Sequence, residues 1–302
     1  MTKIHIIDAF TKTAGTGNRA GVVLEADGLS ASEMQAIAAF AGYSETAFVL
    51  SPSSDDHDIH VRYFTPGAEV PICGHATIAT HFLRATMSGT DAYPIRAKTG
   101  AGILPVSITG EGNELLVSMR QGAVDFGPVF NEIERCQLAS ALNIDPSEFA
   151  DDLPIQIVST GHSKVIVPLR SRQVLDALDP DPDKLIALSK AVGCNGFFPF
   201  VLEGTKEHPE THGRMFAPAI GILEDPVTGN ANGPAGAYLV HYGLVNWPQD
   251  SITYAGHQGH TMGKAGTVHV TVAADDSGLR TSVAGYAVVA GTREYRPSCQ
   301  GT

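Results

Sequence analysis

Two short motifs combine reactive side chains with glycines at points where helices are expected to begin. One motif carries the thiol of Cys73 and the imidazole of His75 around Gly74, and the other carries Thr228 and Asn230 around Gly229. A helix N-terminus offers free N–H groups and about half a positive charge, so both motifs are suited to bind a carboxylate. The glycines could instead serve only tight turns between strand and helix.

One carboxylate near these motifs has no counterpart elsewhere in the chain. Glu45 lies in a turn after an amphipathic segment, and the similar turn at 194–197 has no acid. A single acid in a duplicated turn is typical of one proton-transfer base, although lone turn glutamates are often solvated or capping residues. Glu45 is followed by the apolar run 47–50, and we expect burial to raise its pKa from about 4.3 toward the operating pH. Asp225 is also unmatched, since Val70 holds the corresponding position.

The two glycine motifs correspond to each other because the sequence repeats itself at an offset of about half its length. Arg-x-Phe-x-Pro at 62–66 recurs at 214–218, and Glu-x-Pro-x-x-Gly-x-Ala at 69–76 recurs at 224–231. Phe-Val-Leu at 48–50 recurs at 200–202. These collinear matches predict two homologous domains, 1–118 (to which 290–302 could be added) and 119–289. If the domains pack about a pseudo-two-fold axis, both helix N-termini face one interdomain cleft.

The local patterns agree between the halves. Ser30 with Glu33 predicts a capping box and Gly42 a helix end, while Asp181 and Gly193 bracket a similar amphipathic helix. The segment after Gly74 is apolar on nearly all sides, which predicts a buried central helix.

Its counterpart at about 232–242 contains Pro234, which we expect in a first turn. Strands are predicted at 4–10, 21–25, 47–50, 103–108, 115–120, 155–158, 164–168, 198–202, 267–272 and 282–289. The resulting fold class is α+β, with a curved, mostly antiparallel sheet wrapped around a central helix, twice.

Composition excludes several classes of protein. The 302 residues include 20 Lys and Arg against 32 Asp and Glu, a net charge of −12 that argues against binding nucleic acid or anionic membranes. No apolar run reaches the roughly 18 residues of a membrane span, and the first residues read as a strand rather than a signal peptide. We therefore expect a cytoplasmic protein. Cys73, Cys136, Cys194 and Cys299 are too scattered to predict disulfides or a zinc knuckle.

The sequence resembles the phenazine-biosynthesis PhzF-like isomerase family, and within it a YddE-like bacterial subgroup. The resemblance runs over nearly the whole chain and rests on these motifs: Asp8-Ala9-Phe10, Gly17-Asn18, Ala20-Gly21-Val22-Val23-Leu24, Ser44-Glu45-Thr46, Arg62-Tyr63-Phe64-Thr65-Pro66, Gly74-His75-Ala76-Thr77 and Glu224-Asp225-Pro226-Val227-Thr228-Gly229.

The resemblance implies a diaminopimelate epimerase-like fold and a homodimer that needs no cofactor or metal and moves a proton on a small carboxylate-bearing substrate. It implies Glu45 as general acid and base, with His75 and Asp225 assisting. Asn18 and the turns at Gly74 and Gly229 would line the site.

Two departures leave alternatives open. Cys73 stands where phenazine-pathway members generally have no thiol, and Asn230 stands where they tend to carry Ser. Epimerases of the similar fold use a Cys pair and related proline-modifying enzymes use Cys with Thr, so the resemblance also allows a Cys73/Thr228 epimerase or dehydratase of an amino or imino acid as a second hypothesis. The lowered pKa expected of a thiol at a helix N-terminus supports this hypothesis. A third is a binding protein without chemistry, against which the intact set Glu45, His75 and Asp225 argues.

Three weaker patterns favour ordinary structure. Gly-x-Gly-x-x-Ala at 15–20 precedes a strand-like segment instead of the helix of a dinucleotide-binding motif. The pairs His57/His60, His208/His212 and His257/His260 have metal-like spacing, but their context is more typical of solvated loops. Gly-His-Ser at 161–163 lies between two strands and predicts a turn rather than a nucleophile elbow.

Overall fold

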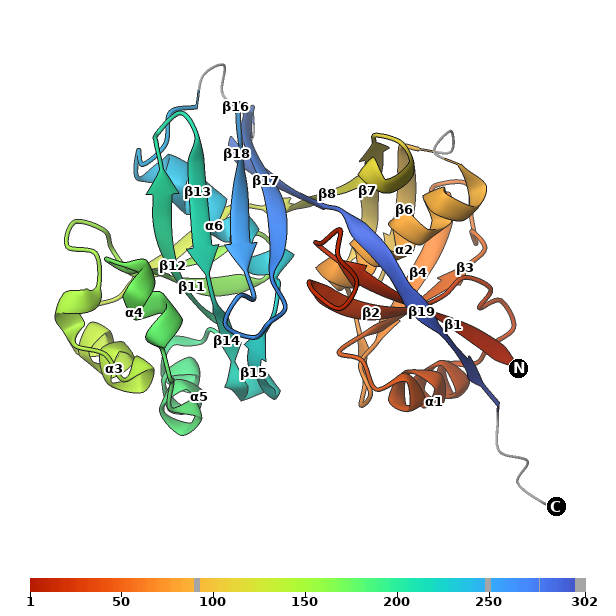
Figure 1. Cartoon of the computed structure of the whole chain (residues 1–302), viewed down its shortest axis with the longest axis horizontal. Helices are drawn as coiled ribbons and strands as arrows, with labels where there is room; N and C mark the ends of the chain where they lie inside the picture. The colour runs from red at the N-terminus through yellow and green to blue at the C-terminus, as the bar shows by residue number, and fades with distance from the viewer. Residues whose placement is uncertain (90–92, 248–250, 277, 297–302) are drawn as a thin grey trace. The chain divides into compact units, whose positions relative to one another are not determined.

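The computed structural model describes residues 1–89, 93–247, 251–276 and 278–296 (Figure 1). These residues form two compact units, the first made of Met1–Arg120 with the described residues from Ala284 onward, and the second of Gln121–Val283. The divisions predicted from the sequence lie after 118 and 289. The second division lies earlier because the predicted strand 282–289 is interrupted at Tyr286, and the chain beyond it pairs within the first unit.

The sheet of the first unit has the neighbour order β19–β1–β2–β3–β4–β6–β7–β8, with β5 added to β4. Its pairs are antiparallel except for β2 with β3 and β4 with β6. The strands are β1 (Thr2–Ala9), β2 (Asn18–Val23), β3 (Thr46–Leu50), β4 (Ile59–Phe64), β5 (Glu69–Val70), β6 (Ile95–Thr99), β7 (Gly102–Thr109), β8 (Leu116–Ala123) and β19 (Ala287–Tyr295).

The second unit repeats this connectivity. Its neighbour order is β9–β10–β11–β12–β13–β16–β17, and the parallel pairs, β11 with β12 and β13 with β16, occupy equivalent places. The strands are β9 (Asp125–Val129), β10 (Gln156–Ser159), β11 (Ser163–Pro168), β12 (Phe197–Gly204), β13 (Pro209–Gly213), β14 (Met215–Ala217), β15 (Ile222–Asp225), β16 (Ser251–Gln258), β17 (Gly266–Asp275) and β18 (Gly278–Gly285). The α+β fold expected from the sequence is confirmed.

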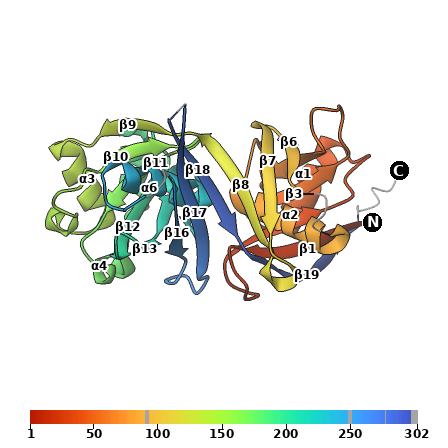
Figure 2. The same ribbon diagram turned by 90° about the horizontal axis from the view of Figure 1, so that it is seen from above.

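Each unit contains one buried helix that its strands surround. Helix α2 (Gly74–Ser88) packs on β1, β2, β3 and β19, and helix α6 (Gly229–His241) packs on β10, β11 and β17, as Figure 2 lets the reader follow. The buried face of α6 is rich in glycine and alanine, which lets the strands approach closely. Helix α6 begins at Gly229, earlier than expected, so Pro234 lies inside it. The missing N–H of Pro234 removes the intrahelical partner of the Asn230 carbonyl.

The amphipathic helices α1 (Ala31–Ala41) and α5 (Pro182–Val192) begin and end where the sequence predicts. Ser30 and Glu33 form a reciprocal capping box, and Gly42 ends α1 in the left-handed conformation. Asp181 caps α5, and Gly193 ends it in the same way. The apolar face of α1 packs on β3, β4 and β19, and that of α5 is buried in the core of the second unit.

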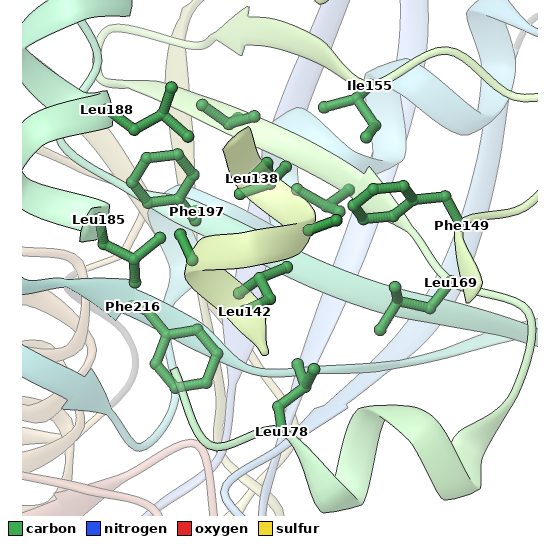
Figure 3. Close-up of a cluster of buried hydrophobic side chains, with 14 of the residues drawn as sticks. Leu138, Leu142, Phe149, Ile155, Leu169, Leu178, Leu185, Leu188, Phe197 and Phe216 are labelled. Carbon is green, nitrogen blue, oxygen red and sulfur yellow. The ribbon is translucent and has the colours of Figure 1, made fainter. Parts of the chain in front are cut away.

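The core of the second unit also uses two helices that the sequence analysis did not predict, α3 (Glu132–Leu142) and α4 (Arg172–Ala177). Figure 3 shows leucines of α3 and α5 beside aromatic side chains of β12 and β14. Short 3₁₀ turns occur at Gly112–Glu114, Pro146–Glu148 and Pro218–Ile220. Among the described residues, no helix is long and apolar enough to cross a membrane.

The repeated motifs form the same ion pair in each unit. Arg62 of β4 binds Glu69 through two hydrogen bonds of 2.7 and 2.8 Å, and Arg214 binds Glu224 through two of 2.9 and 2.8 Å. Each guanidinium also lies over the phenylalanine two residues later, 5.1 Å from the ring centre in the first unit and 4.9 Å in the second. In each unit, the arginine of the motif Arg-x-Phe-x-Pro therefore binds the glutamate of the motif Glu-x-Pro that follows it.

Candidate active site

Glu45 is held in the tight turn between α1 and β3. The turn begins at Gly42, whose N–H donates to the Ala38 carbonyl, and the Glu45 carbonyl accepts from the N–H of Gly21 on β2 at 3.1 Å. The side chain of Glu45 is only 15% exposed. Its backbone is fixed and its carboxylate has little access to water.

His75, in the first turn of α2, lies between three other side chains. Its Nε2 is 3.2 Å from Oε2 of Glu45 and 3.3 Å from the hydroxyl of Ser44. Its Nδ1 is 3.4 Å from the sulfur of Cys73. The structure thus brings together Glu45, Cys73 and His75, and it adds Ser44, which the sequence analysis noted only as part of a motif.

The charges in this cluster differ from those expected. Burial favours the neutral form of Glu45, but the hydrogen bond and the charge of His75 outweigh it, and the pKa of Glu45 lies below its ordinary value. Burial likewise opposes the charge on His75, yet Cys73 and Glu45 raise its pKa well above 6.5. The predicted rise in the pKa of Glu45 is wrong because the ion pair was not visible in the sequence.

The expected low pKa of Cys73 is also wrong. Burial, and then the negative charge of Glu45, raise the pKa of the Cys73 thiol to about 11. These two effects exceed the stabilisation of a thiolate by His75 and by the helix N-terminus. Cys73 is therefore a neutral thiol at physiological pH.

Gly74 leaves open space at the start of α2. A Cβ at Gly74 would meet no atom within 4 Å, and its backbone is not left-handed. Nothing in the described part of the chain therefore requires glycine there. The side chain of the N-cap residue Cys73 makes no capping hydrogen bond at the start of α2. Backbone N–H groups of this turn remain available to an acceptor.

In the second unit, a network of amides positions the start of α6. The Thr228 hydroxyl donates to the Asp225 carboxylate, and the Gln258 side chain accepts from the Thr228 N–H at 3.1 Å and donates to the Asp225 carbonyl at 2.7 Å. Gln121 donates to the Gly229 carbonyl and to the Asn230 side chain, both at 3.2 Å. Asp225, Thr228, Gly229 and Asn230 are thus brought together.

Three residues of this region, Gln121, Gln258 and a buried lysine, were not predicted from the sequence. A Cβ at Gly233 would lie 1.7 Å from Oε1 of Gln121, so this glycine inside a helix leaves space for the amide. The glycine within the predicted helix was the sequence feature that could have indicated a close neighbour there. Lys164 of β11 is buried, which lowers its pKa, and Asp225 is among the charges acting on it. No sequence motif marked this lysine.

Asn18 is the first residue of β2 and is buried opposite Ala9 of β1. The preceding turn is shaped by Asp8, which accepts from the Gly15 N–H at 2.7 Å and from Arg19. Gly17 has φ 67°, and a Cβ there would lie 2.2 Å from the Ala9 carbonyl. The glycines at 15–20 therefore serve a turn into a strand, as predicted, and not a dinucleotide-binding helix.

Glu45, Cys73 and His75 each offer an atom that could bind a metal, and these atoms lie within 4.8 Å of one another. Two observations count against this use. The Glu45 and His75 atoms already form an ion pair, and the raised pKa values of His75 and Cys73 keep both groups protonated. The charges of the cluster suit proton transfer better than metal binding.

Comparison with known proteins identifies the family. Residues 7–293 match the model of the family PhzC-PhzF, described as phenazine biosynthesis-like protein. The chain belongs to the PhzC-PhzF family. The family member YddE of Escherichia coli K12, named an uncharacterized isomerase, is 46% identical over 288 residues, covering 95% of this chain and 96% of YddE. The PhzF-family phenazine biosynthesis protein of Bacillus anthracis has a crystal structure that matches with a TM-score of 0.88 and 35% identity, covering 98% of this chain and 99% of that one.

A relative with a named reaction is trans-2,3-dihydro-3-hydroxyanthranilate isomerase of Pseudomonas chlororaphis. It is 34% identical over 246 residues, covering 81% of this chain and 82% of the relative. A probable proline racemase from Agrobacterium radiobacter K84 matches with a TM-score of 0.66 at 10% identity, which shows the shared epimerase-like fold alone. This PhzC-PhzF protein is an isomerase, and the predicted enzyme class is confirmed.

The buried ion pair makes stability depend on pH in a defined window. Glu45 has a folded pKa below its ordinary 4.5, so its contribution is present above pH 4.5 and is lost as the pH falls further. His75 has a folded pKa above its ordinary 6.5, so its contribution is present below pH 6.5 and is lost as the pH rises. We expect the stability difference between wild type and His75→Gln to be largest between these values.

Urea unfolding of both proteins from pH 4 to 8 measures this difference. The exposed His208, replaced by Gln, is the matched control and should show no such maximum. A wild-type advantage that does not vary with pH would show that folding does not raise the pKa of His75.

Proposed function

We propose that this protein is a cofactor-independent isomerase that moves a proton between carbon atoms of a small carboxylate-bearing substrate, with Glu45 as base and then acid. The observation that carries the proposal is the buried Glu45–His75 ion pair, 3.2 Å between Oε2 and Nε2. It provides a carboxylate that is ionised, and therefore able to accept a proton, in a site with little water.

The two charge states of Glu45 are balanced by opposing effects. The charge of His75 stabilises the carboxylate before the reaction, and burial stabilises the neutral acid that forms when the proton is taken. Glu45 accepts a proton from one carbon, the bond electrons stay on the substrate, and the same proton or an exchanged one is delivered to another carbon. No net proton is gained or lost, so no co-reactant is needed.

His75 and the start of α2 supply positive charge for the substrate. A protonated imidazole beside the free N–H groups of the first turn stabilises both a substrate carboxylate and the negative charge that develops during transfer. The open space at Gly74 allows such a group to approach the backbone. The substrate of the Pseudomonas relative, an anthranilate derivative by name, carries a carboxylate, which supports this substrate class.

We further propose that the start of α6 in the second unit also binds substrate. Asp225, Thr228, Gly229 and Asn230 would contact the substrate through the start of α6, and Asn18 would line the site from the first unit. The duplicated placement of the two motifs at the starts of α2 and α6 supports this assignment. The homodimer and the cytoplasmic location stay predictions.

The alternative with Cys73 as a second acid or base is supported by its contact with His75, 3.4 Å from sulfur to Nδ1. A thiol with a pKa near 11 can donate a proton but is a poor base at neutral pH. We therefore expect Cys73→Ser to keep turnover within about tenfold, since general acid–base loss costs on the order of 10² to 10⁴. A larger loss in that variant, with unchanged folding, would assign Cys73 to the chemistry.

Deuterium incorporation tests the proposal across a range of candidate substrates. The protein is incubated in D₂O with a panel of small cyclic carboxylic acids and amino acids, and NMR follows carbon-bound protons. We expect exchange or isomerisation of a carboxylate, unchanged by EDTA. Exchange only in compounds that lack a carboxylate, or activity lost on chelation and restored by metal, would contradict the proposal.

A further inference from the structure

Three histidines that are separated in sequence meet on one side of the second unit. His212 of β13 and His257 of β16 are direct partners in the parallel pairing, and their rings stack with centres 4.9 Å apart. Glu210 lies two residues before His212, on the same face of the sheet. One ligand atom each from Glu210, His212 and His257 lies within 4.8 Å of the others. The ring of His260 is 6.1 Å from that of His212.

The ring nitrogens of His212 and His257 differ in whether another group already holds them. Nδ1 of His257 contacts the Thr267 hydroxyl at 3.1 Å, which leaves Nε2, 3.8 Å from Glu210, for another partner. Nε2 of His212 lies 3.2 Å from the carboxylate of Glu203. Its Nδ1 is buried and has no hydrogen-bond partner among the described residues. A buried nitrogen without a partner is costly unless something binds it.

A cation, Arg172, lies near this group of histidines. Arg172 is itself held by Asp176 through hydrogen bonds of 2.9 and 3.0 Å, which offsets its charge.

We propose that Glu210, His212 and His257 form a binding site for a divalent transition metal of the zinc type, with His260 or water as the fourth ligand. Two imidazoles and a carboxylate are a ligand set that zinc uses in proteins, at about 2.0–2.2 Å. Glu210 is 56% exposed, so its side chain is free to close the remaining gap. Glu203 orients His212 in the way that second carboxylates orient metal-binding histidines.

Such a metal would join β13, β16 and the segment after β16. Binding to the folded state alone stabilises a protein by mass action, so the metal would raise the thermal midpoint of the second unit. The site shares no residue with Glu45, Cys73 and His75. It therefore stands independently of the proposed function.

Metal titration of the full chain, without a histidine tag and after EDTA treatment, tests the site. We expect one equivalent of Zn²⁺ to bind by calorimetry and to raise the thermal midpoint. His212→Gln and His257→Gln should each weaken binding by more than ~100-fold, and Glu203→Gln by ~10- to 100-fold. His208→Gln, which removes an exposed histidine just before β13, is the matched control and should bind like wild type.

Cobalt substitution separates this site from the other metal-capable group. We expect Co²⁺ to give visible bands of nitrogen and oxygen ligands, with no intense near-ultraviolet sulfur band, and Cys73→Ser to leave them unchanged. No Zn²⁺ binding at millimolar concentration would overturn the proposal. Binding that survives His212→Gln and His257→Gln combined, or that is lost in Cys73→Ser, would overturn it as well.

Discussion

Glu45→Gln should lower turnover of any confirmed substrate by on the order of 10² to 10⁴-fold while the protein remains folded. The amide has nearly the same shape as the carboxylate but can neither accept nor return the proton. Because the negative charge beside His75 is removed, the pKa of His75 should also fall, and NMR titration of its ring would detect this. Rates are measured by deuterium incorporation on the substrate found in the panel.

The matched control is Glu25→Gln, an exposed glutamate next to the end of β2 in the same unit. It changes the net charge equally and should leave the rate unchanged. Near-native turnover of Glu45→Gln, with a circular dichroism spectrum like that of wild type, would remove Glu45 from the mechanism. The next candidate would then be the Cys73 thiol.

Arg214→Ala should destabilise the protein by about 3–5 kcal/mol, because removal of one partner leaves a buried charge uncompensated. The side chains of Arg214 and Glu224 are only 10% and 17% exposed. The guanidinium also donates to the carbonyls of Leu175 and Leu178, at 3.2 and 2.7 Å, which secures the end of α4. Urea unfolding followed by circular dichroism measures the loss.

The repeat supplies the control for this experiment. Arg62→Ala removes the equivalent ion pair and the equivalent phenylalanine contact of the first unit, but the side chains of Arg62 and Glu69 are 22% and 44% exposed. We expect a loss of only ~0–1 kcal/mol, as for exposed pairs. Equal losses in the two variants would show that burial does not set the strength of these pairs.

The parts of the fold that local patterns encode could be predicted from the sequence. The capping box at Ser30 and the glycine at 193 act within one turn of chain, so they located α1 and α5 correctly. The repeated motifs predicted two similar halves because each motif binds its partner within the same half. Helix α3 was missed although Asn131 and Glu134 form a capping box, since its weak apolar periodicity gave no stripe to follow.

The properties that arise from tertiary contacts could not be predicted in the same way. The pKa values of Glu45 and Cys73 depend on His75, which is distant in sequence from Glu45. His75 is in turn protonated because Glu45 and Cys73 lie beside it. Gln258 and Gln121 reach the start of α6 from strands remote in the chain. The context of each histidine pair predicts a solvated loop, whereas the pairing of β13 with β16 brings His212 and His257, members of different pairs, together.

The pairing of β1 with β19 has a consequence for synthesis. The first unit receives a strand from near the end of the described chain, whereas the second unit is one continuous segment. On the ribosome, domains generally fold in order from the N-terminus. Here residues 121–283 can complete their fold first, while β1 keeps an unpaired edge until 287–295 emerge. The unit that carries Glu45 is therefore the last to mature, and an incomplete chain exposes an edge strand suited to chaperones and to aggregation.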